Sequence, residues 1–303
     1  MSRGMAARVR ELSAGRVPFV HATVVRAQVP SSAKAGDDAV VLPDGTIEGF
    51  VGGQCAETSV RTAALGALRD GETVLLRVLP DDSAPFPDSP GAQVVVNTCL
   101  SGGALEIFLQ PMLPAPLIEV VGYTPVAAAL VRIAEVLDYA TARSLPGAPP
   151  ENASAVVVAS HGRDEHEAIR LALKAGVPYI ALVASRRRGA AVLDELDLTL
   201  EQRARISTPA GLDIGARTAG EVALSILAEV IEKVRSADRS TGDRPAGPPV
   251  PTSPPPRTEI DPVCGMTVVV MPDTPHLTID GVDHWFCGPG CRDHYAAGAV
   301  GSG

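Results

Sequence analysis

The stretch LIEVVGYTPVAAALVRIAEVL, residues 117–137, decides the fold of the second half of the chain. A short β-branched segment runs through a glycine turn into a segment whose apolar residues recur at helical spacing. The same order returns at residues 153–176 and 178–196, and TAGEVALSILAEVIEKV (218–234) adds a closing helix. Strands that alternate with amphipathic helices predict an α/β domain with a Rossmann-like, doubly wound parallel sheet.

The turn after the first of these strands departs from the dinucleotide-binding fingerprint. That fingerprint needs a second glycine two positions after the first, so that the backbone can approach a pyrophosphate. Here Gly122 is followed by Thr124 and Pro125, and the next strand ends with Arg143 and Ser144 instead of a ribose-binding acid. The sequence therefore disfavours NAD binding, although it still predicts a Rossmann-like sheet.

The first part of the chain reads as strands and one helix. Residues 19–27 and 37–51 are β-branched runs, and the second run folds at Asp44-Gly45 like a hairpin. Residues 55–71 have apolar side chains at helical spacing and end at a glycine, and three more strand-like runs follow. This pattern predicts an α+β domain.

Composition and proline content divide the chain into four parts. The segment 236–259 holds seven prolines and almost nothing apolar, which is typical of a semi-rigid, solvated linker. We therefore expect an N-terminal α+β domain (1–113), a Rossmann-like domain (114–235), this linker (236–259) and a small C-terminal metal-binding module (260–303).

The overall charge and hydropathy exclude several classes of protein. A formal net charge of -9 argues against nucleic-acid binding, which usually needs a basic surface. No apolar run is long enough to span a bilayer, and the N-terminus has no apolar leader, so we expect a cytoplasmic protein. Five cysteines in a reducing compartment indicate thiol or metal chemistry instead of a disulfide framework.

The stretch GFVGGQCAETSV (49–60) places Cys55 directly after two glycines and at the start of a predicted helix. Unpaired N–H groups and the helix dipole favour the thiolate there, the form that binds metals and attacks electrophiles. The alternative is that Cys55 is a small buried apolar residue.

Polar residues also follow the later strands, where doubly wound sheets bind ligands. His161 follows one strand and the run Arg186, Arg187, Arg188 follows the next, while Asp213 and Arg217 lie in a glycine-bracketed loop. The arginines would suit an anionic ligand, or they form a solvated face. His161 is either a ligand contact or a capping or core histidine.

The C-terminal part carries three cysteines in a C-x22-C-x3-C pattern, at Cys264, Cys287 and Cys291. Turn glycines flank each cysteine, and the domain is too small for a large core, so the spacing predicts metal ligation. His294 or His284 would supply the fourth ligand. Zinc as a structural ion and copper as a soft ion both fit thiolate ligands.

Several ordered motifs resemble the XdhC/CoxI family over roughly residues 15–235. They are LPDGTIEGFVGGQCAE (42–57), TCLSGGALEIFLQP (98–111), VVVASHGRDEHEAI (156–169), YIALVASRRRGAAVL (179–193) and GLDIGARTAGEVALSILAEVI (211–231). Members of that family are accessory factors that mature molybdenum hydroxylases, such as xanthine dehydrogenase and aerobic carbon monoxide dehydrogenase. The glycine-cysteine variants in this chain are similar to the branch linked to carbon monoxide dehydrogenase.

The resemblance implies that the chain binds the molybdenum cofactor, a molybdopterin, without turning over a substrate. Its partner would be an apo molybdenum hydroxylase, and a sulfurtransferase and a second copy of the chain are further candidates. The thiols would hold the metal end of the cofactor and the arginines its phosphate end. The implied cofactor-binding residues are Gly52, Gly53, Cys55, Glu57, Cys99, Gly102, Gly103, His161, Arg186, Arg187, Asp213 and Arg217.

The C-terminal part resembles the YHS domain, a short metal-binding module, through its DPVCGM start and its Phe-Cys-x3-Cys core. This likeness implies the ligands Cys264, Cys287 and Cys291, with His294 as the fourth.

Two functions from other classes remain open. One is a nicotinamide-dependent oxidoreductase on the Rossmann-like domain. The other is a metal sensor or storage protein in which the C-terminal module does the work.

Overall fold

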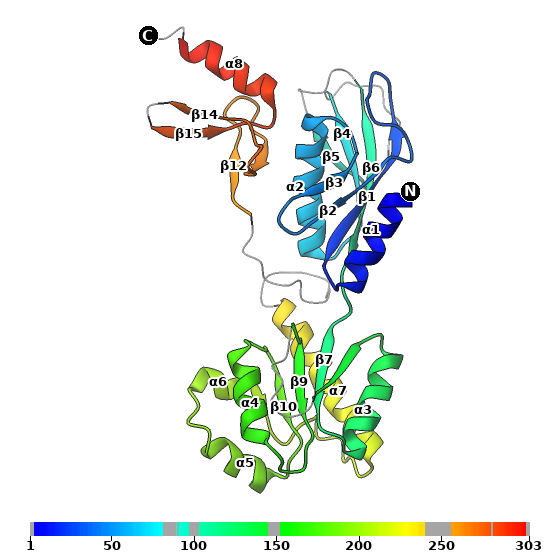
Figure 1. Cartoon of the computed structure of the whole chain (residues 1–303), viewed down its shortest axis with the longest axis vertical. Coiled ribbons are helices and arrows are strands. Elements are labelled where there is room, and N and C mark those ends of the chain that lie inside the picture. The colour runs from blue at the N-terminus through cyan, green and yellow to red at the C-terminus, as the bar shows by residue number, and fades with distance from the viewer. Residues whose placement is uncertain are drawn as a thin grey trace. The chain divides into compact units, whose positions relative to one another are not determined.

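The computed structural model of the chain describes residues 3–80, 89, 91–96, 103–144, 152–239, 256–279 and 281–300. It divides into two compact units (Figure 1). The first unit joins Met1–Pro114 to Val250–Gly303, and the second comprises Ala115–Pro249. No described helix combines the length and the hydrophobicity that a bilayer-spanning segment needs.

A six-stranded mixed sheet forms the centre of the first unit. Its order is β3-β2-β1-β6-β4-β5, and only β4 and β5 pair in parallel. The hairpin between β2 and β3 turns at Gly45, as the sequence predicts, where φ is 88°. The strands are β1 (Phe19–Ala27), β2 (Asp38–Val41), β3 (Ile47–Gly49), β4 (Val74–Leu79), β5 (Gln93–Val96) and β6 (Leu105–Met112).

Two helices pack on opposite faces of this sheet. The predicted helix is α2 (Gln54–Asp70), which buries Val60 and Ala64 against the sheet and ends at Gly71 in the left-handed conformation. The other is α1 (Arg3–Ala14), whose Leu12 packs with Phe19 and Val40. The hydrophobic pattern of the sequence does not predict α1.

The second unit has the predicted doubly wound parallel sheet, in the order β11-β10-β9-β7-β8. Helices α3 and α7 pack on one face, and α4 and α5 on the other. The strands are β7 (Leu117–Val121), β8 (Ala140–Ser144), β9 (Ala155–Val158), β10 (Ile180–Leu182) and β11 (Ile206–Ser207). The helices are α3 (Pro125–Val136), α4 (Glu165–Lys174), α5 (Arg186–Asp194), α6 (Leu200–Ala204) and α7 (Ala219–Arg239).

This strand order fixes where a ligand would bind. The chain passes from β7 outward to β8, and then returns past β7 to form β9 on its other side. The strand order therefore reverses between β7 and β9, and open α/β sheets bind ligands at the carboxyl ends of the strands at such a point.

The C-terminal module consists of two antiparallel strand pairs and one helix. The elements are β12 (Thr258–Ile260), β13 (Thr267–Val269), β14 (His276–Ile279), β15 (Val282–Trp285) and α8 (Pro289–Val300). Its buried core is small and contains Val268, Phe286 and two of the cysteines.

The proline-rich stretch predicts a module that stands apart from the N-terminal domain. Instead, the module contacts that domain through α2. Hydroxyl groups of Thr58 and Thr62 on α2 donate hydrogen bonds to carbonyls of Cys287 and Thr267 in the module. The expected linker is also shorter at both ends, because α7 extends to Arg239 and β12 begins at Thr258.

Candidate functional site

Four potential metal ligands meet in the C-terminal module. One ligand atom each from Asp261, Cys264, Cys287 and Cys291 lies within 4.8 Å of all the others. The Cys287 Sγ atom is 3.6 Å from the Sγ atoms of both Cys264 and Cys291. All three cysteines are thiols and form no disulfide. Asp261 follows β12, Cys264 lies before β13, Cys287 follows β15, and Cys291 lies in the first turn of α8.

The sulfur separations match those of metal-bound thiolates. Zinc–sulfur bonds of 2.3 Å in a tetrahedral site put neighbouring sulfurs about 3.8 Å apart. Cys287 and Cys291 are buried and Cys264 is half-buried, so the cluster lies in a closed, mostly apolar setting. The residues therefore fit a soft or borderline ion.

Asp261 connects the two cysteine-bearing loops and is fully buried. Its Oδ1 atom accepts hydrogen bonds from the backbone N–H groups of Val263 at 2.8 Å and Cys264 at 3.4 Å. Its Oδ2 atom accepts one from the backbone N–H of Cys287 at 2.8 Å. A carboxylate offers about four lone-pair sites, so one site remains for an ion.

Burial and hydrogen bonding shift the pKa values of this cluster in opposite directions. Desolvation alone would raise the pKa of the Asp261 carboxyl, but the N–H groups of Cys287 and Val263 outweigh it and lower that pKa. Desolvation raises the pKa of the Cys264 thiol. A bound cation would favour the thiolate form of Cys264 and offset this penalty.

The structure brings together three of the four predicted metal ligands. His294 is exposed and lies outside the group, and Asp261 takes the place expected for it. His284 packs against the Tyr295 ring, with ring centroids 5.2 Å apart and ring planes tilted by 43°. Asp261 stands three residues before Cys264, and that spacing suits a side chain that caps its own turn. Asp261 was not predicted as a ligand, and this spacing is the signal in the sequence that would have identified it.

The glycine turn before α2 is built for a close backbone approach. Gly52 has φ of 135°, and a Cβ there would lie 2.9 Å from the Ala56 Cβ. Gly53 is the N-cap of α2. Because glycine has no side chain, the first turn of the helix has no side-chain cap at this position. Cys55 and Glu57 lie in that first turn, and Glu57 is half-buried. The Cys55 side chain lies outside the described part of the structure.

The second cysteine loop is described only at its end. Cys99 and Gly102 lie outside the described residues. Gly103 is buried, and a Cβ on it would overlap the carbonyl oxygen of Pro30. The distance between the two predicted thiols therefore stays untested.

In the second unit, the turns after β7 and β9 approach each other closely. Gly122 has φ of 107°, and a Cβ on it would lie 2.5 Å from the Ala159 carbonyl oxygen. Thr124, where the dinucleotide fingerprint needs glycine, caps α3 by accepting the N–H of Ala127 at 3.2 Å. A pyrophosphate would have to displace this cap. The geometry agrees with the sequence in disfavouring a dinucleotide at α3.

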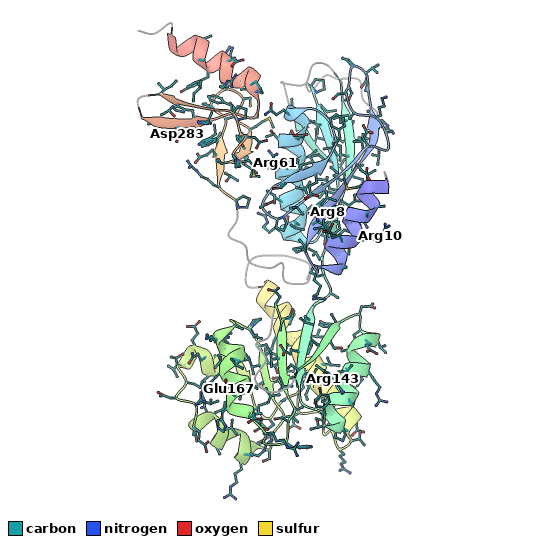
Figure 2. The ribbon with its side chains drawn as sticks, viewed as in Figure 1. Arg8, Arg10, Arg61, Arg143, Glu167 and Asp283 are labelled. Atoms are coloured by element: carbon teal, nitrogen blue, oxygen red, sulfur yellow. The ribbon has the colours of Figure 1, made fainter. Side chains whose placement is uncertain are left out.

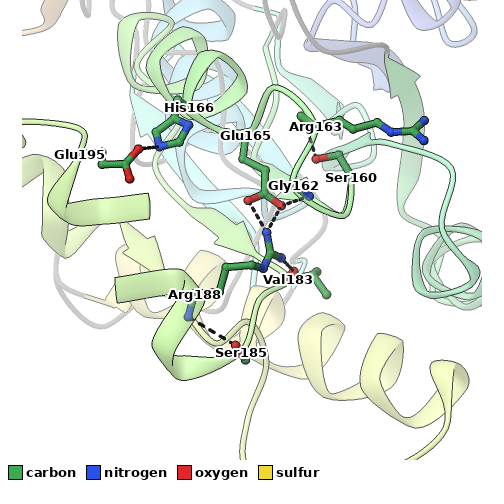
Figure 3. A network of polar contacts seen from close by, with 9 residues as sticks. All are labelled: Ser160, Gly162, Arg163, Glu165, His166, Val183, Ser185, Arg188 and Glu195. Carbon is green, nitrogen blue, oxygen red and sulfur yellow. Dashed lines mark hydrogen bonds and ion pairs between the residues drawn. The ribbon is translucent and has the colours of Figure 1, made fainter. Parts of the chain in front are cut away.

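Figure 3 shows how the loop after β9 is held. Glu165 is 2% exposed and accepts hydrogen bonds from Arg188 at 2.7 and 2.6 Å, and from the Gly162 N–H at 2.8 Å. Arg188 also donates to the Val183 carbonyl. The third arginine of the run is thus structural, and it orders the loop that presents His161 to solvent at φ of 56°.

The other predicted polar residues remain exposed at the same carboxyl edge. Arg186 and Asp213 are 85% and 88% exposed, with a 3.9 Å separation between charged atoms. Arg187 and Arg217 are also exposed. Arg143 lies over the Tyr123 ring, which is 64% exposed; Figure 2 labels Arg143. This edge carries several cations beside exposed apolar side chains, which the sequence analysis missed: Tyr123, Leu212 and Ile214.

An open groove of about 670 Å³ adjoins this edge. Side chains of α3, β8 and the start of α7 line it, and Arg132 and Arg143 supply positive charge. The groove is wide enough for part of a small ligand.

Comparisons with known proteins cover both units. Residues 118–230 match the XdhC Rossmann domain, and residues 12–78 match the XdhC and CoxI family. The Escherichia coli K12 protein YqeB, itself uncharacterised, is 26% identical over 261 residues, which is 76% of this chain. The chain spans 46% of the length of that curated relative.

A solved structure described as a xanthine dehydrogenase from Bacillus halodurans is also similar. It is 16% identical, with a TM-score of 0.37 over 78% of this chain and 97% of that chain. The two family matches together extend over more than half of the sequence, and their order along the chain follows the two units. The chain therefore contains an XdhC Rossmann domain, preceded by a segment that matches the XdhC and CoxI family.

Proposed function

We propose that the chain is an accessory factor that binds the molybdenum cofactor and delivers it to a molybdenum hydroxylase of the xanthine or carbon monoxide dehydrogenase type. The observation that carries the proposal is the start of α2. A glycine turn without a capping side chain presents Cys55 within the first helical turn, in the segment that matches the XdhC and CoxI family. When bound, the cofactor supplies the molybdenum and the dithiolene, and the chain holds and releases it.

The thiol end of the proposed site rests on helix chemistry. The first-turn N–H groups of α2 have no side-chain acceptor at Gly53. Such a helix end stabilises a negative charge nearby, which favours a cysteine thiolate. Soft thiolates suit molybdenum and its sulfur ligand. Cys55 and Cys99 would bind this end of the cofactor.

The second unit carries exposed cations that would bind a phosphate group by themselves. Arg186, Arg187 and Arg217 are all exposed, and the Asp213 carboxylate lies 3.9 Å from the Arg186 guanidinium. Guanidinium groups bind phosphate through paired, charge-assisted hydrogen bonds. His161, at the point where the strand order reverses, would contact the pterin.

Binding and release require no general acid or base, so we propose a non-enzymatic role.

The proposal also includes the YHS-like nature of the C-terminal module and its occupation by zinc or copper. Copper would suit a client of the carbon monoxide dehydrogenase type, because thiolates favour Cu(I). Elemental analysis of anaerobically purified protein checks the metal: zinc that is unaffected by copper supply would exclude the copper role.

Pterin analysis of variants tests the main proposal. Cys55→Ala, Cys99→Ala and the pair Arg186→Gln with Arg187→Gln should each lower the amount of co-purified molybdopterin about tenfold or more, because each removes interactions with a charged group. Arg170→Gln, an exposed arginine on α4, is the matched control and should bind as the wild type does. Wild-type pterin content in all three variants would contradict the proposal.

A nicotinamide-dependent oxidoreductase remains the competing function, and it makes a different prediction. Calorimetry with NAD and NADP would show saturable binding to the second unit. The Thr124 cap on α3 disfavours that result.

A further inference from the structure

The C-terminal module and α2 share an interface built from side chains of one helix face. The Thr58 hydroxyl donates to the Cys287 carbonyl at 2.9 Å, and Thr58 is 5% exposed. The Thr62 hydroxyl lies 3.3 Å from the Thr267 carbonyl. Positions 58 and 62 are one turn apart and therefore face the same way.

A third side chain of α2 lies beside this interface and holds the β2–β3 turn next to it. Arg61, labelled in Figure 2, donates to the Gly45 carbonyl at 2.8 Å. A Cβ built on Gly45 would lie 3.3 Å from the Arg61 side chain and 3.4 Å from the Met271 sulfur. The β2–β3 turn, α2 and the module therefore meet at one place.

The residue that Thr58 contacts is the central cysteine of the metal cluster. Both backbone polar groups of Cys287 are hydrogen-bonded. Its N–H donates to Asp261 at 2.8 Å, and its carbonyl accepts from the Thr58 hydroxyl. Its sulfur lies 3.6 Å from the other two sulfurs. The position of this one residue therefore depends both on the cluster and on α2.

The cluster is also a large part of the module's core. Cys287 is 0% exposed and Cys291 is 5% exposed, and they pack with Val268 and Phe286. A domain of this size has too little apolar area to fold stably on packing alone. In such domains the free energy of metal binding becomes free energy of folding.

We propose that metal loading of the cysteine cluster controls the docking of the C-terminal module on α2. The metal-bound thiolates fix the Cys287 loop, and the fixed carbonyl then accepts the Thr58 hydroxyl. Loss of the metal frees the loop, breaks the contact and uncovers the helix face one turn beyond Cys55. The module is thus a metal-dependent cover on the cysteine-bearing helix. This inference rests on the proposed metal site but not on cofactor binding.

Hydrogen exchange of the full chain, with Zn²⁺ bound and after chelation, tests the proposal. Zn²⁺ should slow exchange at least fivefold in peptides from the module and, in parallel, in peptides from the first two turns of α2. A double variant, Thr58→Val with Thr62→Val, should bind Zn²⁺ with wild-type stoichiometry but lose the effect on α2. Thr58→Ser retains the hydroxyl and should retain the effect.

Thr278→Val is the control, because the Thr278 hydroxyl donates to Asp283 within the β14–β15 hairpin, away from α2. It should leave both metal binding and the exchange of α2 unchanged. The inference is overturned if α2 exchanges equally with and without Zn²⁺ while the module responds, or if the double variant behaves as the wild type does. Failure to bind Zn²⁺ at all would overturn the metal site itself and leave the molybdopterin proposal standing.

Discussion

At the scale of single residues, residue type and spacing did not distinguish between neighbouring candidate positions. Gly52 and Gly53 look alike in the sequence, yet only Gly52 has a positive φ and a neighbour where its Cβ would be. Asp261 replaces His294 beside the cysteines, because a side chain three residues away in a turn reaches the cluster while His294 remains exposed. Spacing predicts which residues share a loop, but not which way each side chain points.

The two glycines before α2 give a matched prediction. Gly52→Ala should lower the free energy of unfolding by about 1–3 kcal/mol, because alanine is strained at φ of 135°. Gly53→Ala should change it by less than about 1 kcal/mol, since φ is −73° and nothing lies within 4 Å of its Cβ. Urea unfolding measures both. Equal losses would show that the turn has another conformation.

At the scale of elements, hydrophobic periodicity predicted the helix after Gly53 and the strands of both large sheets except β11. It missed α1, whose polar sequence RGMAARVRELSA has only a narrow apolar stripe. Hydrophobic periodicity also could not predict which side chains of different elements contact each other. Residue spacing gave no reason why Arg188 should turn inward to the buried Glu165 while Arg186 is 85% exposed.

The bond between α4 and α5 leads to a second prediction. Glu165→Gln should lower the free energy of unfolding by about 2 kcal/mol, because the variant leaves the Arg188 charge without its anionic partner and weakens the bond to Gly162. Glu167→Gln, an exposed neighbour on α4 labelled in Figure 2, is the control and should change it by less than about 0.5 kcal/mol. Thermal or urea unfolding compares the two. Similar losses in both variants would mean that Arg188 does not depend on Glu165.

At the scale of the whole molecule, the alternation of strand-like and helical segments correctly predicted an α/β protein with a Rossmann-like sheet. It could not predict that the C-terminal module joins the N-terminal domain in one unit. The reason is that hydroxyl-to-carbonyl bonds, such as that from Thr58 to Cys287, leave no periodic mark in a sequence.

Removal of residues 240–303 separates the functions of the two parts. We expect the shortened chain to retain molybdopterin binding, because the candidate cofactor residues all precede position 218. It should lose its stoichiometric zinc or copper together with the cluster. Pterin and elemental analysis of the same preparation measure both. Loss of pterin with retained folding would instead favour a metal-storage role for the C-terminal module.

The carboxylate of Asp261 has a consequence for how an ion would leave the cluster. Three backbone amides already hold this side chain in place, so it need not move when it gives up a metal. At a site with three sulfur donors and one oxygen donor, the oxygen would be the weakest ligand of a thiophilic ion. The Asp261 position is therefore where another thiol would compete for a thiophilic ion held by the three cysteines.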